Sequence, residues 1–130
     1  KTISLDDRVS FINRYLNTGN DLLGRSILIS IHTNAAVAPE VRGIEILYAN
    51  DFSAELAKVI ANTLGEDFSV RRTIMGKFYV LSRVPIPGVI VETGFLTNEE
   101  DRKLLLNEEF QNKLIEKLIQ ALENYTKGEK

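Results

Sequence analysis

The only histidine of this 130-residue chain, His32, directly follows a run of apolar, β-branched residues. A second apolar run, residues 88–91, is followed directly by Glu92. Short apolar runs with polar ends are typical of buried strands in a parallel sheet, and open α/β sheets bind ligands at the carboxyl ends of their strands. One imidazole and one carboxylate at the same sheet edge are the minimum for a metal site with an adjacent acid–base group. His32 and Glu92 are therefore the candidate site residues.

Both residues also have simpler interpretations. A single histidine at a strand end is often structural rather than catalytic. A carboxylate is rarely buried unless it is paired or functional, which favours a role for Glu92. Glu92 can still be a solvated strand end or one half of an ion pair, and the pattern alone leaves these alternatives open.

The composition fits one globular domain of ordinary size. The chain is 44% hydrophobic and 26% charged, with a formal net charge of −2, which argues against a basic nucleic-acid-binding face. No apolar run approaches the roughly 20 residues of a membrane span, and no signal-peptide pattern occurs. The absence of cysteine excludes disulfides and thiolate chemistry.

Periodicity and turn signals predict the elements that position the two candidates. Helices are expected at residues 4–16, 53–64 and 108–125, and a further helix is expected to open at the capping-box pattern of residues 97–100. Strands are expected at residues 26–31, 43–48, 78–81 and 88–91. Residues 33–42 and 71–77 are expected to be loops, and residues 126–130 to fray. This alternation predicts an α/β fold, a single domain with a mostly parallel (mixed) central sheet flanked by helices.

Two motifs resemble those of the zinc-dependent N-acetylmuramoyl-L-alanine amidases. Residues 30–35, Ser-Ile-His-Thr-Asn-Ala, resemble the metal-ligand motif of that family. Residues 87–98, Pro-Gly-Val-Ile-Val-Glu-Thr-Gly-Phe-Leu-Thr-Asn, resemble its catalytic-glutamate motif. Residues 42–45 and 78–81 resemble the strands between the two motifs, and the segment from Ser4 to Asn13 resembles the preceding helix. Because the resemblance covers nearly the whole chain in family order, residues 1–130 are identified as an amidase-like catalytic domain.

The resemblance implies a peptidoglycan hydrolase that cleaves the amide bond between N-acetylmuramic acid and L-alanine of the stem peptide. It implies that His32 binds zinc and that Glu92 is the general base. Zinc lowers the pKa of bound water and polarises the carbonyl, and a carboxylate takes the proton and returns it to the leaving amine. Peptidoglycan as the partner implies an extracytoplasmic location, in the cell wall, the periplasm or the medium.

The chain departs from the family pattern at its N-terminus. Family members carry two further zinc ligands, a histidine and a glutamate, before the segment that matches Ser4, and here only residues 1–3 precede it. A catalytic zinc normally has three protein ligands, which His32 cannot supply alone. We therefore expect a domain that is incomplete at its N-terminus. A partner chain or the missing N-terminal segment is expected to complete the sheet.

Two other functions compete with the amidase. The first is a catalytically inactive remnant of the same fold that binds peptidoglycan or protein, and the incomplete ligand set supports it. The second is a metal-free hydrolase, which the absence of a serine elbow motif disfavours. Substrate-binding residues are not identified by the motifs: Arg71, Arg72 and Lys77 either contact stem-peptide carboxylates or belong to a solvated loop.

Overall fold

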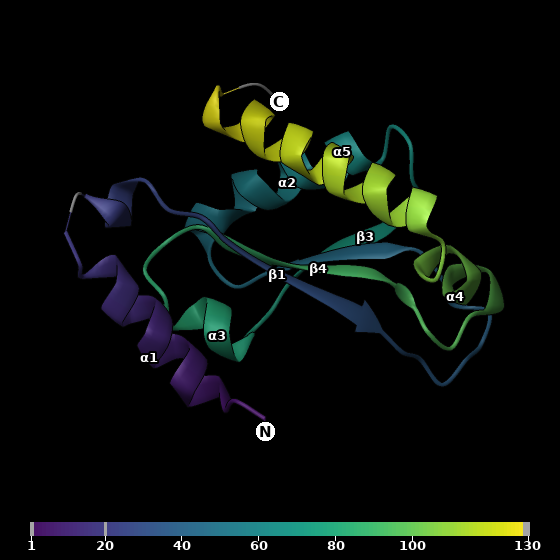
Figure 1. Ribbon diagram of the computed structural model, residues 1–130, viewed down its shortest axis with the longest axis horizontal. Helices are drawn as coiled ribbons and strands as arrows, with labels where there is room; N and C mark the ends of the chain where they lie inside the picture. Colours follow the sequence, from purple (N-terminus) through teal and green to yellow (C-terminus); the bar gives the residue numbers. More distant parts are fainter. Residues whose placement is uncertain (1, 20, 129–130) are drawn as a thin grey trace.

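A single four-stranded sheet forms the centre of the computed structural model, which describes residues 2–19 and 21–128 (Figure 1). Its strands are β1 (Leu28–Asn34), β2 (Ile44–Tyr48), β3 (Val70–Met75) and β4 (Gly88–Phe95). They lie in the order β1-β4-β2-β3. The β1–β4 and β2–β3 pairs are parallel, and the β2–β4 pair is antiparallel. The predicted α/β fold with a mostly parallel, mixed sheet is confirmed.

Helices cover both faces of this sheet. They are α1 (Leu5–Leu16), α2 (Ala54–Leu64), α3 (Tyr79–Ser82), α4 (Glu99–Leu105) and α5 (Glu108–Thr126), with 3₁₀ turns η1 (Leu22–Gly24) and η2 (Asp51–Ser53). In Figure 1, α2 and α5 lie on one side of the strands and α1 and α3 on the other. None of the helices in the described ranges combines the length and the apolar character needed to cross a membrane.

The main core lies between the sheet and the α2–α5 pair. The predicted apolar stripe of α2 faces it, and the buried side chains of β2 and β4 meet it from the sheet. Its buried members are Ile44, Ile46, Leu56, Ala57, Ile60, Leu64, Val89, Val91, Leu114, Leu118 and Ala121. A smaller cluster of Leu16, Val84 and Ile86 holds α1 on the opposite face. Burial of these apolar side chains is the main free-energy source for the fold.

Side chains cap three of the helices. The N–H of Asp7 donates to Ser4 Oγ at the start of α1, as the capping pattern predicts. The N–H of Asp101 donates to Asn98 at α4, and the N–H of Phe110 donates to Asn107 at α5. The cap of α4 is therefore Asn98, one residue later than the capping box predicted at residues 97–100. Each bond satisfies an N–H that has no partner inside its helix.

The prediction was wrong for residues 71–75 and 78–81, whereas residues 76–77 form part of a loop as predicted. Residues 71–77 were expected to form a loop, but β3 includes Val70–Met75, because its polar side chains lie on an edge strand and have partners on β2. Residues 78–81 were expected to form a strand, but the chain forms the single helical turn of α3. The N–H of Ser82 donates to the Phe78 carbonyl at 2.9 Å and closes this turn.

Both strands that carry the candidate residues differ from their predicted bounds. Strand β1 begins at Leu28, two residues later than predicted, and continues past His32 to Asn34. Strand β4 continues past Glu92 to Phe95. The two candidates therefore lie within strands rather than beyond their ends. The predicted fraying is wrong for Thr126, the last residue of α5, and residues 129–130 lie outside the described residues.

The buried carboxylate of Asp101 ties α4 to the ends of two strands. Its Oδ2 accepts the N–H groups of Gly43 and Phe95, each at 2.9 Å. Arg42 approaches its Oδ1 at 3.4 Å. Gly94 passes close by, and a Cβ at that position would lie 3.3 Å from Asp101 Oδ2. The carboxylate thus fixes the end of β4 at Phe95, three residues beyond Glu92.

We expect Asp101→Ala to lower the free energy of unfolding by about 2–4 kcal/mol, because two buried N–H groups lose their acceptor. Asp101→Asn retains an acceptor oxygen and should cost about 1 kcal/mol. Urea unfolding followed by circular dichroism measures both values. Equal stability of the alanine variant and the wild type would contradict this anchoring role.

Candidate active site

Four polar side chains form a row across the sheet. His32 pairs in register with Glu92 in the parallel β1–β4 pair, and Glu92 pairs with Glu45 in the antiparallel β2–β4 pair. Glu45 pairs in turn with Arg72 on β3. Residues that pair directly on neighbouring strands present their side chains on the same face. We call His32, Glu92, Glu45 and Arg72 the charged row.

The charged row lies on the face that carries α1 and α3. A groove of about 760 Å³ runs between these helices and the sheet, and His32 lines it together with Ser30 and Ile90. Ser30 and Ile90 are each two residues before a member of the charged row, and side chains alternate along a strand. The groove therefore leads along this face to His32, and most of its wall is apolar.

His32 is exposed and is held by two local contacts. Its Nε2 lies 2.7 Å from the Ser30 hydroxyl. The Thr93 hydroxyl donates to the His32 carbonyl at 2.9 Å, across the β1–β4 pair. The contact with Ser30 orients the imidazole, and the contact with Thr93 fixes β1 against β4. A neutral imidazole has one nitrogen that can accept a hydrogen bond or bind a metal ion.

Glu92 is half-buried, and one of its carboxylate oxygens is unsatisfied. Among the described residues, Oε2 is buried and has no hydrogen-bond partner. Burial raises the pKa of Glu92, nearby His32 lowers it and nearby Glu45 raises it, so the net pKa lies above the ordinary 4.5. An unpaired carboxylate with a raised pKa beside an imidazole is the arrangement expected of a proton-transfer group.

Glu45 is the fully buried carboxylate of the row, with 3% of its surface exposed. Its Oε1 accepts Asn34 Nδ2 at 3.1 Å, and its Oε2 accepts Arg71 Nη1 at 2.5 Å and Arg72 Nε at 2.8 Å. Burial alone would raise the pKa of Glu45. The hydrogen bonds and positive charges of Arg72 and Arg71 outweigh burial, so the pKa lies below 4.5. The arginines therefore favour the charged form of Glu45, which lies beside Glu92.

The sequence motifs did not identify Glu45, Asn34 or the role of the two arginines. A carboxylate inside the apolar stretch of residues 43–48 was the available signal, since a buried charge needs a partner. The solvated-loop interpretation is wrong for Arg71 and Arg72, which pair with Glu45. Lys77 lines the same groove as His32.

The described residues do not by themselves fit a catalytic zinc. No group of three or more His, Cys, Asp or Glu side chains in residues 2–19 and 21–128 is placed to hold a metal ion. Glu45 is occupied by its arginines, so His32 and Glu92 are the two available donors. A catalytic zinc needs three protein ligands, and using Glu92 as a ligand would remove the base.

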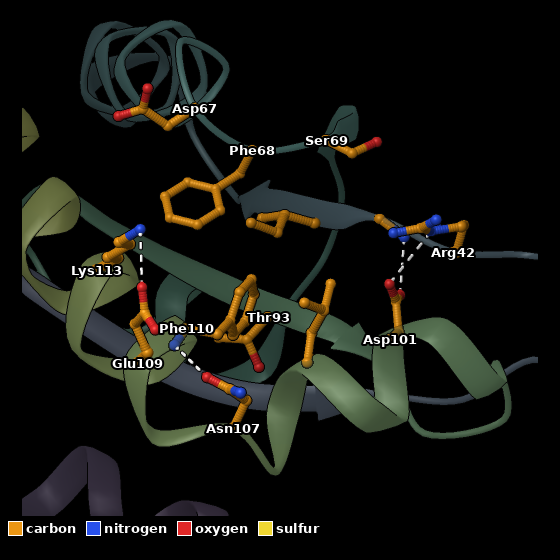
Figure 2. Close-up of a pocket in the computed structure, with 13 residues that line it drawn as sticks. Arg42, Asp67, Phe68, Ser69, Thr93, Asp101, Asn107, Glu109, Phe110 and Lys113 are labelled. Carbon is orange, nitrogen blue, oxygen red and sulfur yellow. Dashed lines mark hydrogen bonds and ion pairs between the residues drawn. The ribbon is translucent and has the colours of Figure 1, made fainter.

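A second pocket, of about 460 Å³, lies on the other side of β4. Figure 2 shows Phe68 and Phe110 in its centre, Arg42 with Asp101 at one end and Lys113 with Glu109 at the other. The charged groups at both ends are already paired. Thr93 lines this pocket, whereas its neighbour Glu92 belongs to the opposite face. The pocket therefore does not share the chemistry of the charged row.

Comparisons with known proteins agree on one family. A family model described as N-acetylmuramoyl-L-alanine amidase matches residues 1–124. The amidase of Clostridium difficile 630 superposes with a TM-score of 0.85 at 30% identity, over 98% of this chain and 67% of that one. The amidase AmiC2 of Nostoc punctiforme gives a TM-score of 0.82 at 31% identity, over 98% of this chain and 68% of that one.

A curated relative is the uncharacterized protein YqiI of Bacillus subtilis strain 168. It is 29% identical over 105 residues, which are 76% of this chain and 50% of that protein. The chain spans half or less of the length of the curated relatives it matches.

We expect Glu45→Gln to destabilise the protein at neutral pH by about 1–3 kcal/mol, because the charge-assisted hydrogen bonds are weakened. The folded pKa of Glu45 is lowered, so the stabilisation is complete above the unfolded pKa and is lost as the pH falls through the folded pKa. The difference between variant and wild type should therefore shrink below about pH 4.5. Urea unfolding at pH 7 and at pH 3.5 measures it, and a difference that grows on acidification would contradict the assignment.

Proposed function

Because the chain belongs to the N-acetylmuramoyl-L-alanine amidase family, we propose that it is the catalytic part of a peptidoglycan hydrolase. The bond that it cleaves is the amide between N-acetylmuramic acid and the L-alanine of the stem peptide. The observation that carries this proposal is the in-register pair of His32 and Glu92 on adjacent parallel strands. A potential ligand and a potential base are thereby side by side on one face.

Glu92 moves the proton in the proposed reaction. An amide is a poor electrophile and water is a poor nucleophile, so a base must take a proton from the attacking water and an acid must protonate the leaving amine. One carboxylate can do both in sequence. Its raised pKa brings it closer to neutrality, where it can accept the proton and also return it.

His32 is one zinc ligand in this proposal, and the remaining ligands come from outside residues 1–130. Strand β1 has β4 as its neighbour and lies at the end of the strand order. In residues 2–19 and 21–128, no strand lies beside its other edge, so this edge offers unpaired backbone groups. The adjoining groove is lined by apolar residues of α1, including Leu5, Phe11 and Ile12. A strand from a preceding segment or a partner chain would pair here, next to His32.

Peptidoglycan as the substrate gives an extracytoplasmic site of action. The inactive remnant is the weaker alternative, because a protein without proton transfer has no use for a carboxylate like that of Glu92. Its Oε2 is buried without a partner among the described residues, and such groups usually persist for a functional reason. In the proposed hydrolase, that oxygen accepts a hydrogen bond from the attacking water.

We expect Glu92→Gln to reduce amide hydrolysis by about 10²–10⁴-fold, the usual effect of removing a general base. The protein should carry residues 1–130 together with the segment that supplies the other ligands. Release of L-alanine-terminated peptides from purified sacculi measures the activity, and zinc content should be unchanged. The control is Glu116→Gln, an exposed carboxylate on α5. Near-normal turnover by the Glu92 variant would refute its role.

Residues 1–130 alone should hold zinc weakly and release no peptide from sacculi. The described donors number fewer than the three that a catalytic zinc needs, and affinity falls steeply when water replaces protein ligands. Metal analysis after dialysis against a mild chelator tests this, and one retained zinc per chain would overturn it.

The matched variant for that experiment is His32→Ala in a protein that carries the remaining ligands. It should lose zinc in the same dialysis because one of three ligands is gone. Unchanged zinc content would show that His32 is structural.

A further inference from the structure

At the β3 end of the charged row, two arginines lie beside the single carboxylate of Glu45. Arg71 and Arg72 both donate to the same oxygen, Glu45 Oε2. One guanidinium is sufficient to balance one carboxylate, so this group of three side chains keeps a net charge of about +1 by simple counting. A partly exposed positive charge beside a reaction site attracts an anionic part of a ligand.

The two arginines are not equivalent. Arg71 has 35% of its side chain exposed, and its guanidinium lies 5.9 Å from the centre of the buried Phe95 ring. A terminal nitrogen of Arg71 donates to the buried carboxylate of Glu45. We therefore assign Arg71 to the neutralisation of Glu45. Arg72 is more open, with 55% exposed, and it bonds Glu45 through Nε. The two terminal nitrogens of Arg72 therefore remain available to a ligand. They form the edge of the guanidinium that binds a carboxylate with two parallel hydrogen bonds.

Arg72 lies at a distance from Glu92 that a short peptide can span. The two residues are separated by β2 in the strand order, which places their backbones about 10 Å apart at the usual strand spacing. An extended peptide advances about 3.3–3.6 Å per residue. The bond to Glu45 draws the guanidinium towards β2 and shortens the span. About two residues therefore reach from a scissile amide at Glu92 to the free edge of Arg72.

We propose that Arg72 binds a carboxylate on the second residue of the peptide, the residue that follows L-alanine. The proposal rests on the proposed function for the identity of the peptide. Glu45 is the positioning residue: its hydrogen bond to Nε holds the guanidinium with its terminal edge free. The acidic groups of the row do not prevent binding, because Arg71 balances Glu45 and because β2 separates Glu92 from Arg72.

Direct binding to residues 1–130 tests this proposal without zinc and without catalysis. The probes are two peptides, L-alanyl-γ-D-glutamyl-amide with a free α-carboxylate and the same peptide with an α-carboxamide. Titrations followed by ¹H–¹⁵N NMR give the two dissociation constants and also report on folding. The variants are Arg72→Gln, Arg72→Lys and the control Lys103→Gln, which removes a positive charge from the exposed face of α4.

The wild type should bind the carboxylate peptide about tenfold more tightly than the carboxamide peptide, the low end for a hydrogen bond to a charged group. Arg72→Gln should abolish this difference and leave carboxamide binding unchanged. Arg72→Lys should retain part of it, because it keeps the charge but not the fork. Lys103→Gln should keep all of it.

Three results would overturn the proposal. The first is that the wild type binds both peptides with equal affinity, and the second is that it binds neither. The third is that Arg72→Gln lowers the affinity for both peptides equally, as expected if the arginine is purely structural. The proposed function fails separately, if a ligand-complete protein does not hydrolyse sacculi while the wild-type preference for the carboxylate peptide persists.

Discussion

The site depends on one electrostatic constraint, two carboxylates that face each other across β2 and β4. Glu45 and Glu92 pair directly in the antiparallel register, a position at which like charges destabilise a sheet. The arginines of β3 and the amide of Asn34 hold Glu45 as a buried, fully bonded anion. Burial is the main reason that the pKa of the adjacent Glu92 is raised, and the negative charge of Glu45 adds to this effect. The pKa values of the two carboxylates are therefore shifted in opposite directions by their surroundings.

The two faces of the sheet differ in polarity: one is apolar, and the other carries the charged row. The face under α2 and α5 is apolar and supplies the main core, so the strands can carry charged residues on the other face without losing their anchor. The buried Asp101 on α4 fixes the end of β4 by accepting the N–H of Phe95. Rigid strands position side chains more accurately than loops do, and both residues of the proposed site, His32 and Glu92, lie within strands.

Sequence patterns predicted most elements of the fold because the relevant signals are local. Apolar periodicity located α1, α2 and α5, and the apolar runs located β1, β2 and β4. The same reasoning failed at β3 and α3. An edge strand with polar side chains does not show the apolar pattern of a buried strand, and a single helical turn is too short to show a helical period.

The sequence by itself determined the chemistry that is available: one imidazole, a glutamate after an apolar run, no cysteine, and two motifs that resemble one family. Only the tertiary structure decided which of these groups meet. Strand register aligned Glu92 with His32 on one side and Glu45 on the other, and the bulge at the start of the β2–β3 pair brought two consecutive arginines to the same carboxylate oxygen. Register is set by packing and hydrogen bonds between strands that are distant in the chain, so no local pattern in the sequence could specify it.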